Sequence, residues 1–119
     1  MSSRDLTVLT DVVLITCVIR RGAGDDVARA AQEAGARGAV MQLGRGPGVQ
    51  DRLGVAGLFP DTEKEIVHVL AATEQAQQVF ERMFAAGGLD TPGAGFIYAT
   101  PLEKVAACLP PDAVPKGDG

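Results

Sequence analysis

The hydrophobic pattern of the first half of the chain predicts a strand, a helix and a second strand. The stretch from Val12 to Ile19 is almost continuously apolar and rich in β-branched residues, which is typical of a central strand buried on both faces. After a glycine-rich turn, apolar residues return at the i, i+3, i+4, i+7 spacing of a helix. We expect Asp25 to be the N-cap of this helix, Gly35 to end it, and residues 38–43 to form the next strand.

The second half repeats this order of elements. Residues 64–71 predict a third strand, and Thr73 is the expected cap of a helix whose apolar stripe extends to Phe84 and which ends at a glycine pair. Residues 96–100 predict a short fourth strand. We expect the chain to leave the sheet at Pro101.

The order β-α-β-β-α-β predicts an α+β ferredoxin-like fold, with an antiparallel sheet and two helices on one of its faces. This domain is expected over residues 12–105, followed by an extended or flexible C-terminal tail over 106–119. The uncovered face of such a sheet would still carry apolar strand residues. Because a large exposed apolar patch rarely persists on a monomer, we expect the protein to self-associate.

A glycine-rich loop between the two halves is the most informative segment for function. Closely spaced glycines let backbone N–H groups surround an anion, and Arg45 and Arg52 can add charge-assisted hydrogen bonds. A second cluster, Gly93 and Gly95, precedes the last strand, and in an oligomer the two clusters could line one cleft at a subunit boundary. The loop lacks the dinucleotide-binding fingerprint and the GK[ST] of a P-loop. Taken alone, it fits a flexible connection without function equally well.

Composition narrows the possible functions. The 119-residue chain has a formal net charge of −4 and an aromatic content of 4%, whereas nucleic-acid binding needs a basic surface or exposed aromatic platforms. We therefore exclude nucleic acid as a partner. No apolar stretch reaches the roughly 20 residues of a membrane span, and the first residues lack the pattern of a signal peptide. We expect a cytoplasmic protein without direct membrane insertion.

Thiol and metal chemistry find little support in the sequence. Cys17 and Cys108 are not spaced as metal ligands or as a disulfide framework, and we interpret them as reduced, small hydrophobic side chains. His68 is the only histidine and lies within a predicted strand, where we expect a hydrogen-bonded or interfacial side chain rather than a ligand. We therefore expect no metal requirement.

Four segments resemble the P-II family of trimeric signal-transduction proteins, and they follow one another in the family's order. Residues 46–50, Gly-Pro-Gly-Val-Gln, match the family's G-x-G-x-Q at the base of its T-loop. Residues 25–27, Asp-Asp-Val, resemble the opening of its first helix, and 65–67 resemble the start of its third strand. Residues 93–105 are similar to the segment that the family writes as GDGKIF followed by LPVERV.

The resemblance implies a regulatory protein rather than an enzyme. It implies a homotrimer whose clefts between subunits bind an adenine nucleotide, which is ATP, ADP or AMP. A T-loop over about residues 44–62 would change conformation to control a target protein, such as a membrane transporter or an enzyme of nitrogen or carbon metabolism. The nucleotide-binding residues that the resemblance implies are Gly44, Arg45, Gly46, Pro47, Gly48, Val49, Gln50, Arg52, Gly93, Gly95 and Phe96.

The chain also departs from the family's pattern. Phe96 stands where the family has the lysine of GDGK, and Ala107 and Leu109 stand where nitrogen-regulatory members have two arginines. With these phosphate-binding cations missing, a nucleotide with less phosphate charge, such as ADP, AMP or a cyclic nucleotide, suits the site better than ATP. Tyr98 is the only tyrosine and lies outside the loop, so uridylylation at the family's usual tyrosine is excluded.

Two other functions remain open on the same fold. One is a trimeric metal-responsive or structural protein of the divalent-cation-tolerance type, for which His68 and the cysteines are the available ligands. The other is a small hydrolase of the acylphosphatase type, which needs an Arg–Asn pair. The chain contains no asparagine, which makes the hydrolase the weaker of the two.

Overall fold

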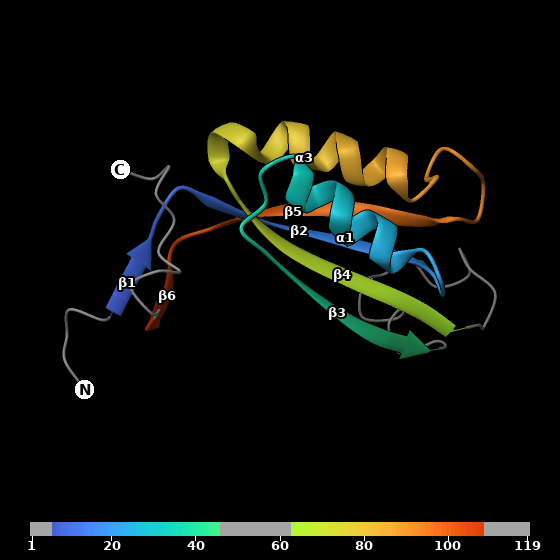
Figure 1. The fold of residues 1–119 in the computed structure, drawn as a ribbon, viewed down its shortest axis with the longest axis horizontal. Helices are drawn as coiled ribbons and strands as arrows, with labels where there is room; N and C mark the ends of the chain where they lie inside the picture. Colours follow the sequence, from blue (N-terminus) through green and yellow to red (C-terminus); the bar gives the residue numbers. More distant parts are fainter. Residues whose placement is uncertain (1–5, 46–62, 109–119) are drawn as a thin grey trace.

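The computed structural model, which describes residues 6–45 and 63–108, contains a four-stranded antiparallel sheet with both helices packed on one face (Figure 1). Its strand order is β3-β4-β2-β5. The strands of this sheet are β2 (Val12–Arg20), β3 (Gly38–Arg45), β4 (Glu63–Ala72) and β5 (Gly95–Leu102), and the helices are α1 (Gly24–Glu33) and α3 (Thr73–Ala86). This arrangement confirms the α+β, ferredoxin-like expectation.

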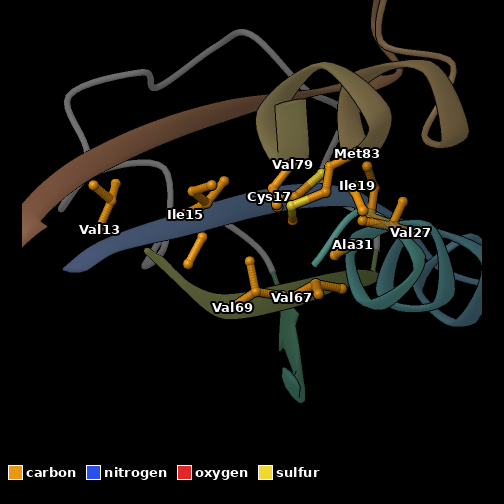
Figure 2. Close-up of a cluster of buried hydrophobic side chains, with 12 residues drawn as sticks. Val13, Ile15, Cys17, Ile19, Val27, Ala31, Val67, Val69, Val79 and Met83 are labelled. Atoms are coloured by element: carbon orange, nitrogen blue, oxygen red, sulfur yellow. The ribbon is translucent and has the colours of Figure 1, made fainter. Parts of the chain in front are cut away.

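The β-branched run predicted as a central strand is β2, which pairs with β4 on one side and with β5 on the other. Ile15 and Cys17 point from β2 towards the helices and are fully buried. They lie beside Val67 and Val69 of β4, which belong to the same core (Figure 2). Alternation along these two strands therefore places one side-chain set in the core and the other on the face that the helices leave uncovered.

Each helix covers the sheet with a stripe of apolar residues at the predicted spacing. Val27 and Ala31 of α1 and Val79 and Met83 of α3 are completely buried. Figure 2 shows Met83 and Val79 above Cys17, and Ala31 and Val27 beside Ile19 and Val67. Phe84, which the pattern placed in the same stripe, is 37% exposed and lies at the margin of the core.

The helix starts differ from the sequence expectation. Asp25 is not the N-cap of α1, because the helix begins one residue earlier at Gly24 and its N-cap, Ala23, offers no side-chain acceptor. Thr73 does not cap α3 either, since α3 begins at Thr73 itself directly after β4. The predicted end of α1 is correct, because Gly35 adopts a left-handed φ of +112° after the C-cap residue Ala34.

The end of β5 also differs, because β5 continues to Leu102 and Pro101 pairs with Val13. We had expected the chain to leave the sheet at Pro101. β5 is an edge strand, and a proline is tolerated there because its missing N–H can face away from the paired neighbour.

A separate two-stranded ribbon was not predicted. β1 (Leu6–Leu9) pairs antiparallel with β6 (Val105–Cys108), with Leu6 opposite Cys108 and Leu9 opposite Val105. In Figure 1 the ribbon stands beyond the end of the sheet at which β2 begins. Residues 106–108 of the expected tail are thus in β6, and 109–119 lie outside the described residues.

The face of the sheet without helices carries a mixture of apolar, aromatic and polar side chains. Across its middle runs a row of one residue from each strand, Val40, His68, Thr16 and Tyr98. Thr16 Oγ1 and His68 Nδ1 share a hydrogen bond of 3.1 Å, and Tyr98 stacks on Phe96 with ring centroids 6.2 Å apart. The hydrogen-bonded histidine agrees with the interpretation of His68 as a satisfied side chain.

Candidate functional site

The two glycine clusters lie at the same end of the sheet, where β2 and β3 end and β4 and β5 begin. The pairing register places Gly44 of β3 beside Lys64 of β4, and Lys64 beside Arg20 of β2. On the other side of β2, Gly95 of β5 pairs with Ile19. The loop that follows β3 and the turn that precedes β5 therefore both start from this end.

Within one chain, however, the two clusters stand at opposite edges of the sheet. β3 and β5 are the outermost strands, with β4 and β2 between them. Three strand spacings separate them, a distance of roughly 14 Å. A single chain therefore does not bring Gly44 and Gly95 into one cleft.

The structure describes only some of the predicted site residues. The backbone of Gly44 and Arg45 forms the last two positions of β3, at the start of the expected T-loop. Gly93 lies in the turn before β5, and Gly95 and Phe96 are the first residues of β5. The remaining predicted residues lie outside the described part of the chain, namely Gly46, Pro47, Gly48, Val49, Gln50 and Arg52, as does the rest of the loop to residue 62.

Gly93 and Gly95 have different physical roles. Both have left-handed φ angles, +78° at Gly93 and +150° at Gly95. A Cβ atom on Gly95 would collide with the carbonyl oxygen of Val18, so Gly95 allows β5 to lie against β2. A Cβ atom on Gly93 would meet nothing within 4 Å, so its backbone borders open space. Of the two glycines, Gly93 is the one that leaves room for an approaching ligand.

Phe96, which occupies the family's lysine position, turns towards the uncovered face of the sheet. It pairs with Val18 and stacks on Tyr98. Its ring therefore contributes apolar surface to that face and offers no cation to a phosphate group.

Sequence reasoning missed the carboxylates of β4 at this end of the sheet. Neither Glu63 nor Glu65 is among the site residues that the sequence predicts. Glu63 Oε1 lies 2.6 Å from Arg21 Nη1, and Glu65 Oε1 accepts a 2.6 Å hydrogen bond from the backbone N–H of Gly24. The available signal was the alternation of β4, which places Glu63 and Glu65 on the same face as Val67.

Glu65 replaces the missing side-chain cap of α1. The first N–H groups of a helix have no acceptor within the helix, and the helix dipole favours negative charge near them. Asp25 and Asp26 add two acidic side chains to the same first turn. The N-terminus of α1 therefore already has carboxylates around it, which disfavours the binding of a further anion there.

A shallow depression of about 440 Å³ opens beside this helix start. Its floor and walls come from the β2–α1 turn and from the C-terminal end of α3. Arg20, Arg21 and Asp26 are its charged residues. Arg21 pairs with Glu63 and Asp26 with Arg29 at 3.3 Å, so two of these three charges already have partners.

Cys17 is a structural thiol. It is fully buried between the sheet and the helices, and desolvation by burial raises the pKa of its thiol to about 12. A thiol with so high a pKa carries almost no thiolate at neutral pH and is a poor nucleophile or metal ligand. In residues 6–45 and 63–108, no three His, Cys, Asp or Glu side chains gather into a group that could hold a metal ion. Over the same residues, no helix is long and apolar enough to span a bilayer.

We expect Glu65→Ala to lower the free energy of unfolding by about 1–2 kcal/mol, the usual cost of losing a helix cap or of leaving a buried N–H without an acceptor. Urea denaturation followed by circular dichroism measures this loss. Glu63→Ala is the matched control two residues earlier, because its partner Arg21 has a side chain that is 61% exposed and such pairs contribute little. Equal losses for the two variants would contradict the capping role of Glu65.

A search of solved structures places this architecture among known folds. The chain is similar to the structure described as "Crystal Structure of Arabidopsis thaliana PII bound to citrate", with a TM-score of 0.61 and 16% sequence identity over 79% of each chain. No protein-family model and no curated protein matches the sequence. The structural similarity shows that the chain has a P-II-like fold.

Proposed function

From the P-II-like fold, we propose that this protein is a non-enzymatic regulator that binds an adenine nucleotide between the subunits of a homotrimer. One observation supports this proposal most directly. The segments that carry Gly44 and Gly93 lie at the same end of the sheet but at its opposite edges. In a ring of three copies, the start of the loop after β3 in one subunit can approach the Gly93 turn of the next, which would bring the two segments together.

The chemistry of these segments suits a small anionic ligand. The loop after β3 would supply backbone N–H groups from Gly46 and Gly48 and the charges of Arg45 and Arg52. The turn at Gly93 would supply the opposite wall from the neighbouring subunit, and its open backbone gives a nucleotide room to approach. No metal is required by this arrangement. Because Phe96 adds no cation, we propose ADP or AMP ahead of ATP.

The regulatory output is proposed to run through the loop over residues 44–62. A nucleotide that contacts the start of this loop would favour one of its conformations and so change the affinity for a target protein. By linkage, the target must change the affinity for the nucleotide by the same factor. The class of target, a membrane transporter or a metabolic enzyme in the cytoplasm, is carried over from the P-II resemblance alone.

Isothermal titration of the purified protein with ATP, ADP, AMP, cyclic AMP and citrate tests the ligand. We expect saturable binding of at least one adenine nucleotide, and we expect Gln50→Ala to weaken it at least tenfold. The matched control is Gln32→Ala, the same change at an exposed position of α1, which should bind as the unchanged protein does. Light scattering on each variant checks that the oligomer is kept. Absence of binding by every nucleotide at high micromolar concentration would refute the nucleotide proposal.

A further inference from the structure

The β1–β6 ribbon is an apolar arm that packs poorly on its own chain. Leu6 and Val8 are 51% and 52% exposed, and no charged residue occurs in either strand. The ribbon forms a sheet of its own, separate from the four-stranded sheet. An isolated two-stranded ribbon is at best marginally stable in water, so an arm of this kind needs a further surface to pack on.

The β3 edge of the main sheet is also apolar and exposed, and it can pair with another strand. Val40 and Met41 are 62% and 45% exposed, and the strand carries neither proline nor charge from Gly38 to Gly44. Proteins normally protect a sheet edge with charges, prolines or a covering segment. The other edge, β5, contains Pro101. In the part of the chain that the structure describes, β3 is therefore the edge that is open to pairing with another strand.

The ribbon and the β3 edge do not meet within one chain. The described molecule measures 48 × 26 × 22 Å, and Figure 1 shows the ribbon at one end of the longest axis, beyond the sheet, with β3 running away from it. A second copy of the chain offers both surfaces at once. Neither the ribbon nor the stretch of β3 from Gly38 to Gly44 carries a charged residue, although 22% of the residues in the protein are charged. Contact between the two surfaces would therefore bury no unpaired charge.

We infer that the β1–β6 ribbon of one copy pairs with the β3 edge of a second copy. The backbone groups of β3 that face away from β4 gain hydrogen-bond partners, and the exposed side chains of the ribbon pack beside Val40. The contact joins two different surfaces, so it repeats head to tail and can close into a ring. The inference rests on the homotrimer of the proposed function and is independent of whether a nucleotide binds.

Charge-reversal pairs test the contact. Val40→Lys, Val8→Glu and Leu6→Glu each place a charge in the proposed interface, and each should raise the dissociation constant of the oligomer at least tenfold. Combining Val40→Lys with Val8→Glu or with Leu6→Glu in one chain should restore association in at least one combination, since every interface then holds an opposite pair. Sedimentation velocity measures association, and thermal melting by circular dichroism confirms that each variant is folded.

The matched control is Gln78→Lys, which places the same charge at an exposed position of α3, outside the proposed contacts, and should leave association unchanged. If neither double variant associates better than its single variants, or if Gln78→Lys disrupts association as strongly as Val40→Lys, the ribbon contact is wrong. A wild-type protein that stays at the 12.3 kDa mass of one chain would refute both the homotrimer and this contact. A wild-type trimer with no nucleotide binding would refute the proposed ligand and leave the ribbon contact standing.

Discussion

Replacing Gly95 by alanine is expected to lower the free energy of unfolding by about 3 kcal/mol or more. Gly95 has a φ of +150°, which an alanine rarely adopts, and the new Cβ would collide with the carbonyl oxygen of Val18. That oxygen belongs to the backbone of the central strand β2, so it cannot move aside as a flexible side chain would. The variant must separate β5 from β2 locally. Urea denaturation followed by circular dichroism measures the loss.

Gly93→Ala is the control for this experiment, because Gly93 also has a left-handed φ but borders open space. Its cost should be limited to the backbone term, about 1 kcal/mol. Comparing the two variants separates the loss of stability due to the backbone conformation from the loss due to the collision between β5 and β2. If Gly95→Ala were no more destabilising than Gly93→Ala, the collision with β2 would not determine the stability of this part of the sheet.

Met83→Ala is expected to lower the free energy of unfolding by about 2–5 kcal/mol, the range for truncating a fully buried large side chain. Met83 has no exposed surface and packs from α3 onto the β2 residues of the core (Figure 2). Because a domain is usually stable by only about 5–15 kcal/mol, such a loss removes a large share of the total.

The next residue in the same helix provides the control for Met83. Phe84 is larger but 37% exposed, and Phe84→Ala should cost clearly less, because less of its surface leaves water on folding. Thermal melting of both variants beside the unchanged protein gives the comparison. A larger loss at Phe84 than at Met83 would mean that α3 packs on the sheet through a different face.

The main sheet could be predicted from the sequence because its signals are local. The β-branched run of β2 and the alternation of β4 both reflect side chains that point to opposite faces of one strand. The helix stripes that contain Val27 and Met83 follow in the same way from the helical period. These patterns depend on residues that are close in sequence, and the order of the elements then leads to the ferredoxin-like topology.

The start of α1 and the ribbon could not be predicted, because each depends on residues far apart in the chain. Asp25 was the best local N-cap, but Glu65 reaches the first N–H of the helix from β4, more than a third of the chain away. Four-residue strands such as β1 give too short a pattern to recognise, and the partner of β1 lies at the other end of the described chain. Only the three-dimensional arrangement reveals such pairings.

The candidate site was predicted only in part. The sequence identified Gly93 and Gly95 together as ligand-binding glycines, whereas the structure shows that Gly95 allows β5 to approach β2 and that Gly93 borders open space. A glycine in a sequence is compatible with close strand packing and with an open ligand site, because both depend on the absence of a side chain. The residues from Gly46 to Arg52 lie outside the described part of the chain and stay predictions.

The ribbon also determines where additions to the protein can be made. Leu6 pairs directly with Cys108, so the two ends of the described chain lie side by side. They lie at the Val12 end of β2, whereas Gly44 and Gly95 lie at the Arg20 end, about 30 Å away along a nine-residue strand. A fluorescent reporter fused next to either end would therefore stand well away from Gly44 and Gly95 of its own chain. A short linker between the two ends would give a circularly permuted chain whose new termini could be opened in an exposed turn.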